Sequence, residues 1–136
     1  MIRVLHYGLG PVGLNIARRV AKEPLLTSVA AVDINPEYEN MTLAELAKES
    51  DARLKRVRIS SKLPKGKAHV AVHTTSSWLE EIEEQLAALL SAGFHVVSTA
   101  EELICPLPKH KKRIARLDRL AKRKKRAFNN LSLLLQ

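Results

Sequence analysis

The chain is 136 residues long, which fits one domain with a substantial hydrophobic core. Hydrophobic residues make up 46% of it, but no apolar run approaches the roughly 20 residues that cross a bilayer, so we expect no membrane span. The formal net charge of +9 comes from one segment, because residues 109–126 hold eleven Lys or Arg and one acid, Asp118, while the remaining chain is nearly neutral.

Strand-like and helix-like patterns alternate along the chain. The first segment is an apolar run typical of a strand, without a basic-then-apolar leader. The single cysteine, Cys105, excludes an internal disulfide and a CxxC metal site, so we expect no bound metal. The missing leader and the single cysteine together favour a cytoplasmic protein. Capping boxes are predicted for Thr42 with Glu45 and for Ser77 with Glu80. The predicted strands are 2–7, 28–32, 56–59, 69–73 and 94–98, and the predicted helices are 11–23, 43–49, 78–92 and 109–126.

This alternation predicts an α/β fold of the doubly wound class, a parallel sheet with helices on both faces. The strands read as solid apolar runs, as expected for strands buried on both sides. We therefore expect one Rossmann domain over residues 1–126. Residues 127–136 depart from the pattern, and their leucines, at roughly 1.5–3 kcal/mol for each buried side chain, are too apolar to stay in water. A sixth strand on the sheet edge is favoured over self-association for these leucines, which are Leu131, Leu133, Leu134 and Leu135.

The run HYGLGPVG, residues 6–13, places three glycines in G-x-G-x-x-G spacing between a strand and a helix. A simple tight turn is the alternative explanation. In this context Gly8 can make the turn, Gly10 can let a ligand approach the backbone, and Gly13 can let helix and strand pack closely. A helix N-terminus offers free N–H groups to a phosphate, and Pro11 suits its first turn. The motif therefore predicts a pyrophosphate site.

Asp33 ends the second predicted strand, 20 residues beyond Gly13. A carboxylate at this place reaches the ribose hydroxyls of a bound adenosine, although a solvated loop acid is the structural alternative. It would repel a 2′-phosphate, and residues 34–36 supply no cation, which favours NAD over NADP unless Arg53 or Arg56 folds nearby. A methyltransferase also places an acid here, but its first loop usually has another glycine pattern, so that interpretation is secondary.

Two further segments, residues 74–77 and 99–102, follow the fourth and fifth predicted strands. Ligands of open α/β sheets bind beyond the carboxyl ends of the strands, so these segments are candidates for the nicotinamide side of a cofactor. Each has a structural alternative: Ser77 as a helix cap, the two glutamates of the second segment as acids near a helix start, and the preceding His73 as a structural residue. No catalytic residue is assigned.

Three stretches carry a resemblance to a known family: HYGLGPVG, AVDINP at 31–36, and HTTSSWLEEIEEQLAALLSAGFHVVSTAEEL at 73–103. They resemble the amino-terminal domain of the 2,4-diaminopentanoate dehydrogenase family, relatives of dihydrodipicolinate reductase. The resemblance covers residues 1 to about 125, and STAEEL is more specific than the glycines. It implies a Rossmann domain for NAD or NADP. By motif, the pyrophosphate would be held by Gly8, Gly10, Pro11, Val12 and Gly13, the ribose by Asp33, and the nicotinamide half would lie along Thr74, Thr75, Ala100 and Glu101.

The resemblance also implies an oxidoreductase that transfers hydride at a carbon bearing nitrogen, on a small amino-acid-like substrate. Family members have a second, larger domain that supplies most substrate contacts and the oligomer interface. Residues 126–136 lack the glycine-rich turn that would lead into it. We therefore expect the substrate domain to be absent and this chain alone to be inactive.

Two other functions are consistent with the sequence. One is a nucleotide-binding or interaction module without catalysis. The other is nucleic-acid binding through residues 109–126, which is disfavoured because no aromatic residue lies within the basic run. A solvated outer helix face explains that run more simply.

Overall fold

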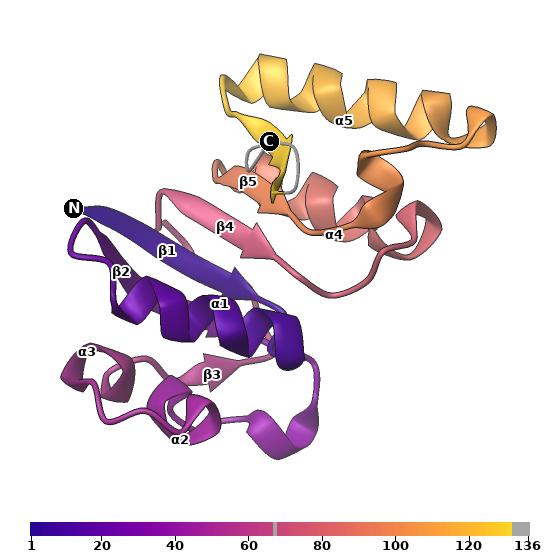
Figure 1. Cartoon of the computed structure of the whole chain (residues 1–136). Coiled ribbons are helices and arrows are strands. Elements are labelled where there is room, and N and C mark those ends of the chain that lie inside the picture. The colour runs from indigo at the N-terminus through magenta and orange to yellow at the C-terminus, as the bar shows by residue number, and fades with distance from the viewer. Residues whose placement is uncertain (67, 132–136) are drawn as a thin grey trace.

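The computed structural model describes residues 1–66 and 68–131, and Figure 1 shows how their helices and strands are arranged. The strands are β1 (Ile2–Tyr7), β2 (Leu26–Val32), β3 (Ile59–Ser60), β4 (Val70–His73), β5 (His95–Ser98) and β6 (Phe128–Asn130). The α-helices are α1 (Pro11–Ala21), α2 (Leu43–Ala47), α3 (Ala52–Lys55), α4 (Leu79–Ser91) and α5 (Lys111–Lys124). Short 3-10 helices occur at Pro36–Tyr38, Glu101–Leu103 and Pro108–His110.

All six strands belong to one parallel sheet in the order β3-β2-β1-β4-β5-β6. The order reverses between β1 and β4, which is the switch point where doubly wound folds bind their ligands. Tyr7 lies in register with Val32 on one side and His73 on the other, so β1, β2 and β4 end at the same edge. The predicted doubly wound Rossmann fold is confirmed.

Helices cover the two faces of the sheet in separate groups (Figure 1). Helices α1, α2 and α3 lie together on one side, and α4 and α5 lie together on the other. Each group has its own cluster of buried apolar side chains, as a two-sided sheet requires. The first cluster includes Leu9, Leu43, Leu54 and Ile59, and the second includes Leu5, Leu86, Leu90, Phe94 and Leu117.

The basic helix α5 uses part of its charge against α4. Glu83 of α4, only 9% exposed, accepts hydrogen bonds from Arg116 at 2.7 Å and from Arg113 at 2.8 Å. These hydrogen bonds lower the pKa of the Glu83 carboxyl. Lys109 forms a further ion pair with Glu80 at 3.2 Å. The segment therefore has a structural role, and its lack of nucleic-acid binding remains a prediction.

Two predictions of local structure need correction. Ser77 does not cap α4, which begins at Leu79; the carboxylate of Glu102 accepts the Leu79 N–H at 2.8 Å instead. The third strand is later and shorter than 56–59, because the preceding residues pair with another segment. Leu43 N–H donates to the Val57 carbonyl, and the residues on either side form an antiparallel bridge, Thr42 with Arg58.

The carboxyl-terminal segment, predicted to form an edge strand through its leucines, contains the strand β6, which pairs in parallel with β5 at the sheet edge. It precedes the leucines, however: Leu131 follows it, and residues 132–136, with Leu133, Leu134 and Leu135, lie outside the described residues. In the described part of the chain, no helix has the length and apolar character needed to cross a membrane. The same residues contain no group of His, Cys, Asp or Glu arranged to hold a metal ion.

Candidate functional site

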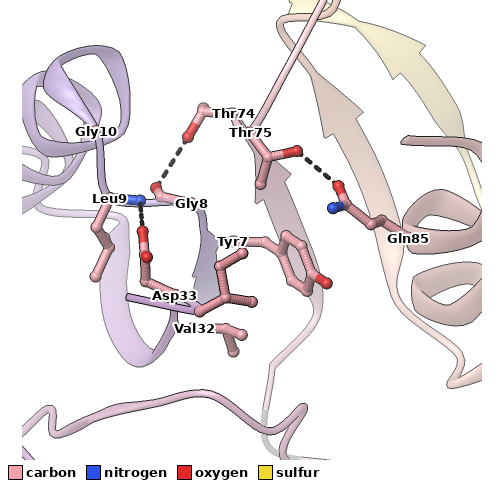
Figure 2. Close-up of a pocket in the computed structure, with 10 residues that line it drawn as sticks. Tyr7, Gly8, Leu9, Gly10, Val32, Asp33, Thr74, Thr75 and Gln85 are labelled. Atoms are coloured by element: carbon pink, nitrogen blue, oxygen red, sulfur yellow. Dashed lines mark hydrogen bonds between the residues drawn. The ribbon is translucent and has the colours of Figure 1, made fainter. Parts of the chain in front are cut away.

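A cleft of about 300 Å³ lies at the carboxyl ends of β1, β2 and β4. Figure 2 shows Asp33 at one end, Thr75 and Gln85 at the other, and Tyr7 between them. The cleft thus spans the switch point of the sheet, where sequence reasoning placed the ligand. Its lining residues are Tyr7, Gly8, Leu9, Gly10, Val32, Asp33, Ile34, Thr74, Thr75 and Gln85.

The three glycines of the motif have different local environments. Gly8 has φ +106°, a conformation that strongly favours glycine, and its carbonyl accepts the Thr74 hydroxyl at 2.9 Å. A Cβ on Gly13 would lie 2.1 Å from the Gly8 oxygen, so α1 packs against the turn only with glycine there. A Cβ on Gly10 would meet no atom within 4 Å. Gly10 therefore leaves open space above the loop without a packing role of its own.

The N-terminus of α1 faces this open space. Gly10 is the N-cap and Pro11 the first helical residue, and no side chain of the described residues caps the helix. The first N–H groups of a helix and its dipole bind anions at such ends. Val12 in the first turn is 54% exposed, so bulky side chains do not enclose this end.

Asp33 links the end of β2 to the glycine loop. One carboxylate oxygen accepts the Leu9 N–H at 2.8 Å, and the other accepts the Asn35 N–H at 2.9 Å. Arg53 does not come near it, because the Arg53 guanidinium binds Asp51 and the carbonyl of Leu26 at the amino end of β2. Arg53 is therefore excluded as a cation beside Asp33.

A neutral polar network closes the other end of the cleft. His73, fully buried at the end of β4, bonds the Ser98 hydroxyl through Nδ1 at 2.9 Å and Gln85 Oε1 through Nε2 at 2.8 Å. The Thr75 hydroxyl also donates to Gln85 Oε1, at 2.6 Å. Burial lowers the pKa of His73, and its ring stacks on Tyr7 at 5.6 Å. His73 thus has the structural role that its place in a strand suggests.

The structure gathers only part of the predicted site around the cleft. Gly8, Gly10, Asp33, Thr74 and Thr75 line it. Pro11, Val12 and Gly13 stand behind the loop in the first turn of α1, outside the lining. Ala100 is buried, with its carbonyl bonded to Asn130, and Glu101 lines a different surface pocket beside Trp78. Their contact with a cofactor remains a prediction.

Sequence reasoning missed Tyr7 and Gln85. Tyr7 stands just before the glycines, and strand alternation directs its ring toward α4 rather than α1. Gln85 lies in the middle of an amphipathic helix, six residues after Leu79, and nothing in its neighbours marks it. The available signal was that Gln85 is a polar residue on the side of α4 that faces the sheet.

No model of a known protein family matches the chain, and no curated protein matches it by sequence. Among solved structures, the chain is similar to an amine dehydrogenase from Mycobacterium smegmatis, with a TM-score of 0.80 and 26% identity. This match covers 90% of the chain and 37% of the dehydrogenase.

Two more distant structures share the fold. A biliverdin reductase from Synechocystis, solved with biliverdin and NADP+, has a TM-score of 0.68 and 19% identity over 95% of this chain and 37% of its own. The WlbA dehydrogenase from Chromobacterium violaceum, solved with NADH and UDP-GlcNAcA, has a TM-score of 0.71 and 19% identity. This match covers 96% of our chain and 34% of the dehydrogenase. The chain thus spans little more than a third of the proteins that it matches.

Proposed function

We propose that residues 1–126 form the dinucleotide-binding domain of an oxidoreductase that uses NAD, and that hydride transfer occurs at a carbon bearing nitrogen. The main support for this proposal is the cleft at the switch point of the sheet. At one end of the cleft Asp33 accepts a hydrogen bond from the Leu9 N–H, and the backbone of Gly10 beside it is accessible. The similarity to an amine dehydrogenase supports the choice of reaction class.

The glycine loop fits a pyrophosphate. Space above Gly10, where a side chain would otherwise stand, admits a bulky group to the backbone. The uncapped N-terminus of α1 supplies N–H donors and a partial positive charge for its oxygens. Gly8 and Gly13 keep the loop and helix close enough for both features to act on one ligand.

Asp33 fits the adenosine ribose. Two backbone N–H groups fix its carboxylate at the rim of the cleft, where vicinal hydroxyls can donate to the remaining lone pairs. The same negative charge opposes a 2′-phosphate. With Arg53 held at the opposite end of β2, the lining residues offer no cation to offset this repulsion, which supports NAD over NADP.

The end of the cleft at Thr74, Thr75 and Gln85 is then the place for the nicotinamide. When bound, that group accepts or donates the hydride, and the protein supplies orientation. Tyr7, stacked on buried His73, gives this end a rigid wall. Ala100 and Glu101, on the neighbouring strand end, are proposed to lie further along the same half.

Calorimetric titration of the purified chain with NAD and with NADP tests the cofactor. We expect NAD to bind in the micromolar range or more weakly, about −8 kcal/mol or less favourable, and NADP more weakly still. Absence of heat with both ligands would refute dinucleotide binding.

A chimera tests whether this domain supports hydride transfer. This chain would replace the matching part of the mycobacterial amine dehydrogenase, and the release of NADH from amines would be measured. We expect amine oxidation. A chimera that folds and binds NAD but oxidises no amine would contradict the proposal that this domain supports transfer at a carbon bearing nitrogen.

A further inference from the structure

Gln85 lies at the end of the cleft opposite Asp33, and its side chain points into the cleft toward Tyr7 (Figure 2). It belongs to α4, whereas the other lining residues come from β1, β2 and the segments that follow β1, β2 and β4. It is half-buried, so a donor on its amide is shielded from bulk water but accessible from the cleft.

The network beneath Gln85 favours one orientation of its amide. Ser98 Oγ accepts the Ala100 N–H at 3.2 Å, which leaves its hydroxyl proton for His73 Nδ1 at 2.9 Å. With this tautomer the neutral His73 ring carries its proton on Nε2, which lies 2.8 Å from Gln85 Oε1 and 3.0 Å from the Thr75 hydroxyl oxygen. The assignment satisfies both nitrogens of a buried ring.

A second donor meets the same oxygen. The Thr75 hydroxyl donates to Gln85 Oε1 at 2.6 Å, so this oxygen accepts two hydrogen bonds and uses both lone pairs. In this arrangement the amide nitrogen is the free end. Within the described residues, Gln85 Nε2 has no hydrogen-bond partner, and the cleft is the space beside it.

We infer that Gln85 Nε2 donates a hydrogen bond to the carboxamide oxygen of a bound nicotinamide, and that His73 and Thr75 are positioning residues that hold the amide in this orientation. The inference rests on the proposed function, which places the nicotinamide at this end. A neutral acceptor is preferred to a substrate carboxylate, because Asp33 is the charged residue among those lining the cleft and no cation accompanies it.

Gln85→Glu is the sharpest variant for a test. Its carboxylate keeps an oxygen for His73 and Thr75 but replaces the inward donor by an acceptor. NADH is the probe, because its dihydronicotinamide ring is uncharged, and ADP-ribose is the matched ligand without the ring. We expect the variant to bind NADH roughly tenfold more weakly and ADP-ribose within about twofold of the wild type. Glu84→Gln, at an exposed neighbouring position on α4, is the control and should change neither.

The outcomes are separable. Equal weakening of both ligands, or of neither, by Gln85→Glu overturns the assignment of Gln85, whereas failure of the wild type to bind either ligand overturns the proposed function itself. If the variant does not fold, side-chain amide NMR of the wild type decides. The Gln85 NH₂ resonances should move on NADH binding and stay in place with ADP-ribose; equal movement with both contradicts the inference.

Discussion

The Asp33 carboxylate accepts the backbone N–H of Leu9 across a sequence separation of 24 residues, at 2.8 Å. This bond ties the end of β2 to the turn between β1 and α1. The acid proposed to bind the ribose therefore also holds the loop proposed to bind the pyrophosphate. The proposal therefore implies that adenosine and phosphate recognition are coupled through one side chain.

Asp33→Ala should weaken NAD binding more than NADP binding. The variant loses charge-assisted bonds to the ribose, worth about 1.5–3 kcal/mol, for both ligands. For NADP this loss is offset by removal of the repulsion between the carboxylate and the 2′-phosphate. Calorimetry with both cofactors gives the ratio of their affinities. A larger loss for NADP would show that Asp33 does not face the ribose.

Gly10→Val and Gly13→Ala should separate ligand binding from folding. A side chain at Gly10 enters open space, so the variant should keep its stability and circular dichroism spectrum while losing NAD binding. A Cβ at Gly13 collides with the Gly8 carbonyl at 2.1 Å, so this variant should unfold more readily, by about 2 kcal/mol or more. Denaturant titrations and calorimetry on both variants provide the test. Retained NAD binding by Gly10→Val would exclude the loop as the phosphate site.

The alternating periodicity was enough to predict the sheet, its parallel strands and the edge at which the cleft lies, because those depend on local apolar pattern and on the rules of crossover connection. Local patterns also located Gly8, Gly10 and Asp33, since all three lie in the short segments that follow β1 and β2. What the sequence did not indicate depends on contacts between distant segments. Glu102 caps α4 from beyond β5, and Gln85 reaches the cleft from the middle of a helix.

His6 should make the fold sensitive to mild acid. It is buried in β1 with its Nε2 2.8 Å from the Ser28 hydroxyl, and burial lowers the pKa of His6 from 6.5 to about 4. Between pH 6.5 and pH 4, His6 is therefore protonated in the unfolded chain but not in the folded chain. The contribution of His6 to the free energy of unfolding is complete above pH 6.5 and is lost as the pH falls toward 4. The loss from this group is about 3 kcal/mol.

His6→Gln tests this origin of the acid sensitivity, because an amide can still bond Ser28 without titrating. Unfolding by urea at several pH values should give a flatter dependence between pH 6.5 and 4 than in the wild type. His73, whose pKa burial also lowers, acts in the same direction and should leave part of the slope. Identical slopes in variant and wild type would exclude His6 as the titrating group.

Glu102→Ala should be among the more destabilising substitutions outside the apolar core. Its carboxylate accepts the Leu79 N–H at the start of α4 and lies 2.9 Å from His110 Nε2. Removing it leaves two buried groups without partners, at a cost of about 3 kcal/mol. Glu102→Gln keeps one oxygen for Leu79 and should cost less. Chemical denaturation of both variants gives the order, and equal losses would mean that the bond to Leu79 contributes little.

The edge strand β6 should stabilise the fold through Asn130. This side chain is 2% exposed and donates from Nδ2 to the Ala100 carbonyl at 2.7 Å, which joins β6 to the segment after β5. Asn130→Ala should therefore lower the free energy of unfolding by about 2 kcal/mol, whereas Asn129→Ala, at an exposed position of the same strand, should have little effect.

Deleting residues 129–136 removes most of β6 and the leucine-rich segment together, so the melting temperature should fall by roughly 5 °C or more. Gel filtration of the intact and shortened chains distinguishes the two roles predicted for this segment. If β6 acts within its own sheet, both chains run at the same oligomeric state and differ in melting temperature. A chain that self-associates only when intact would show instead that the leucines meet a second molecule, while equal stability of both forms would contradict any packing role for the segment.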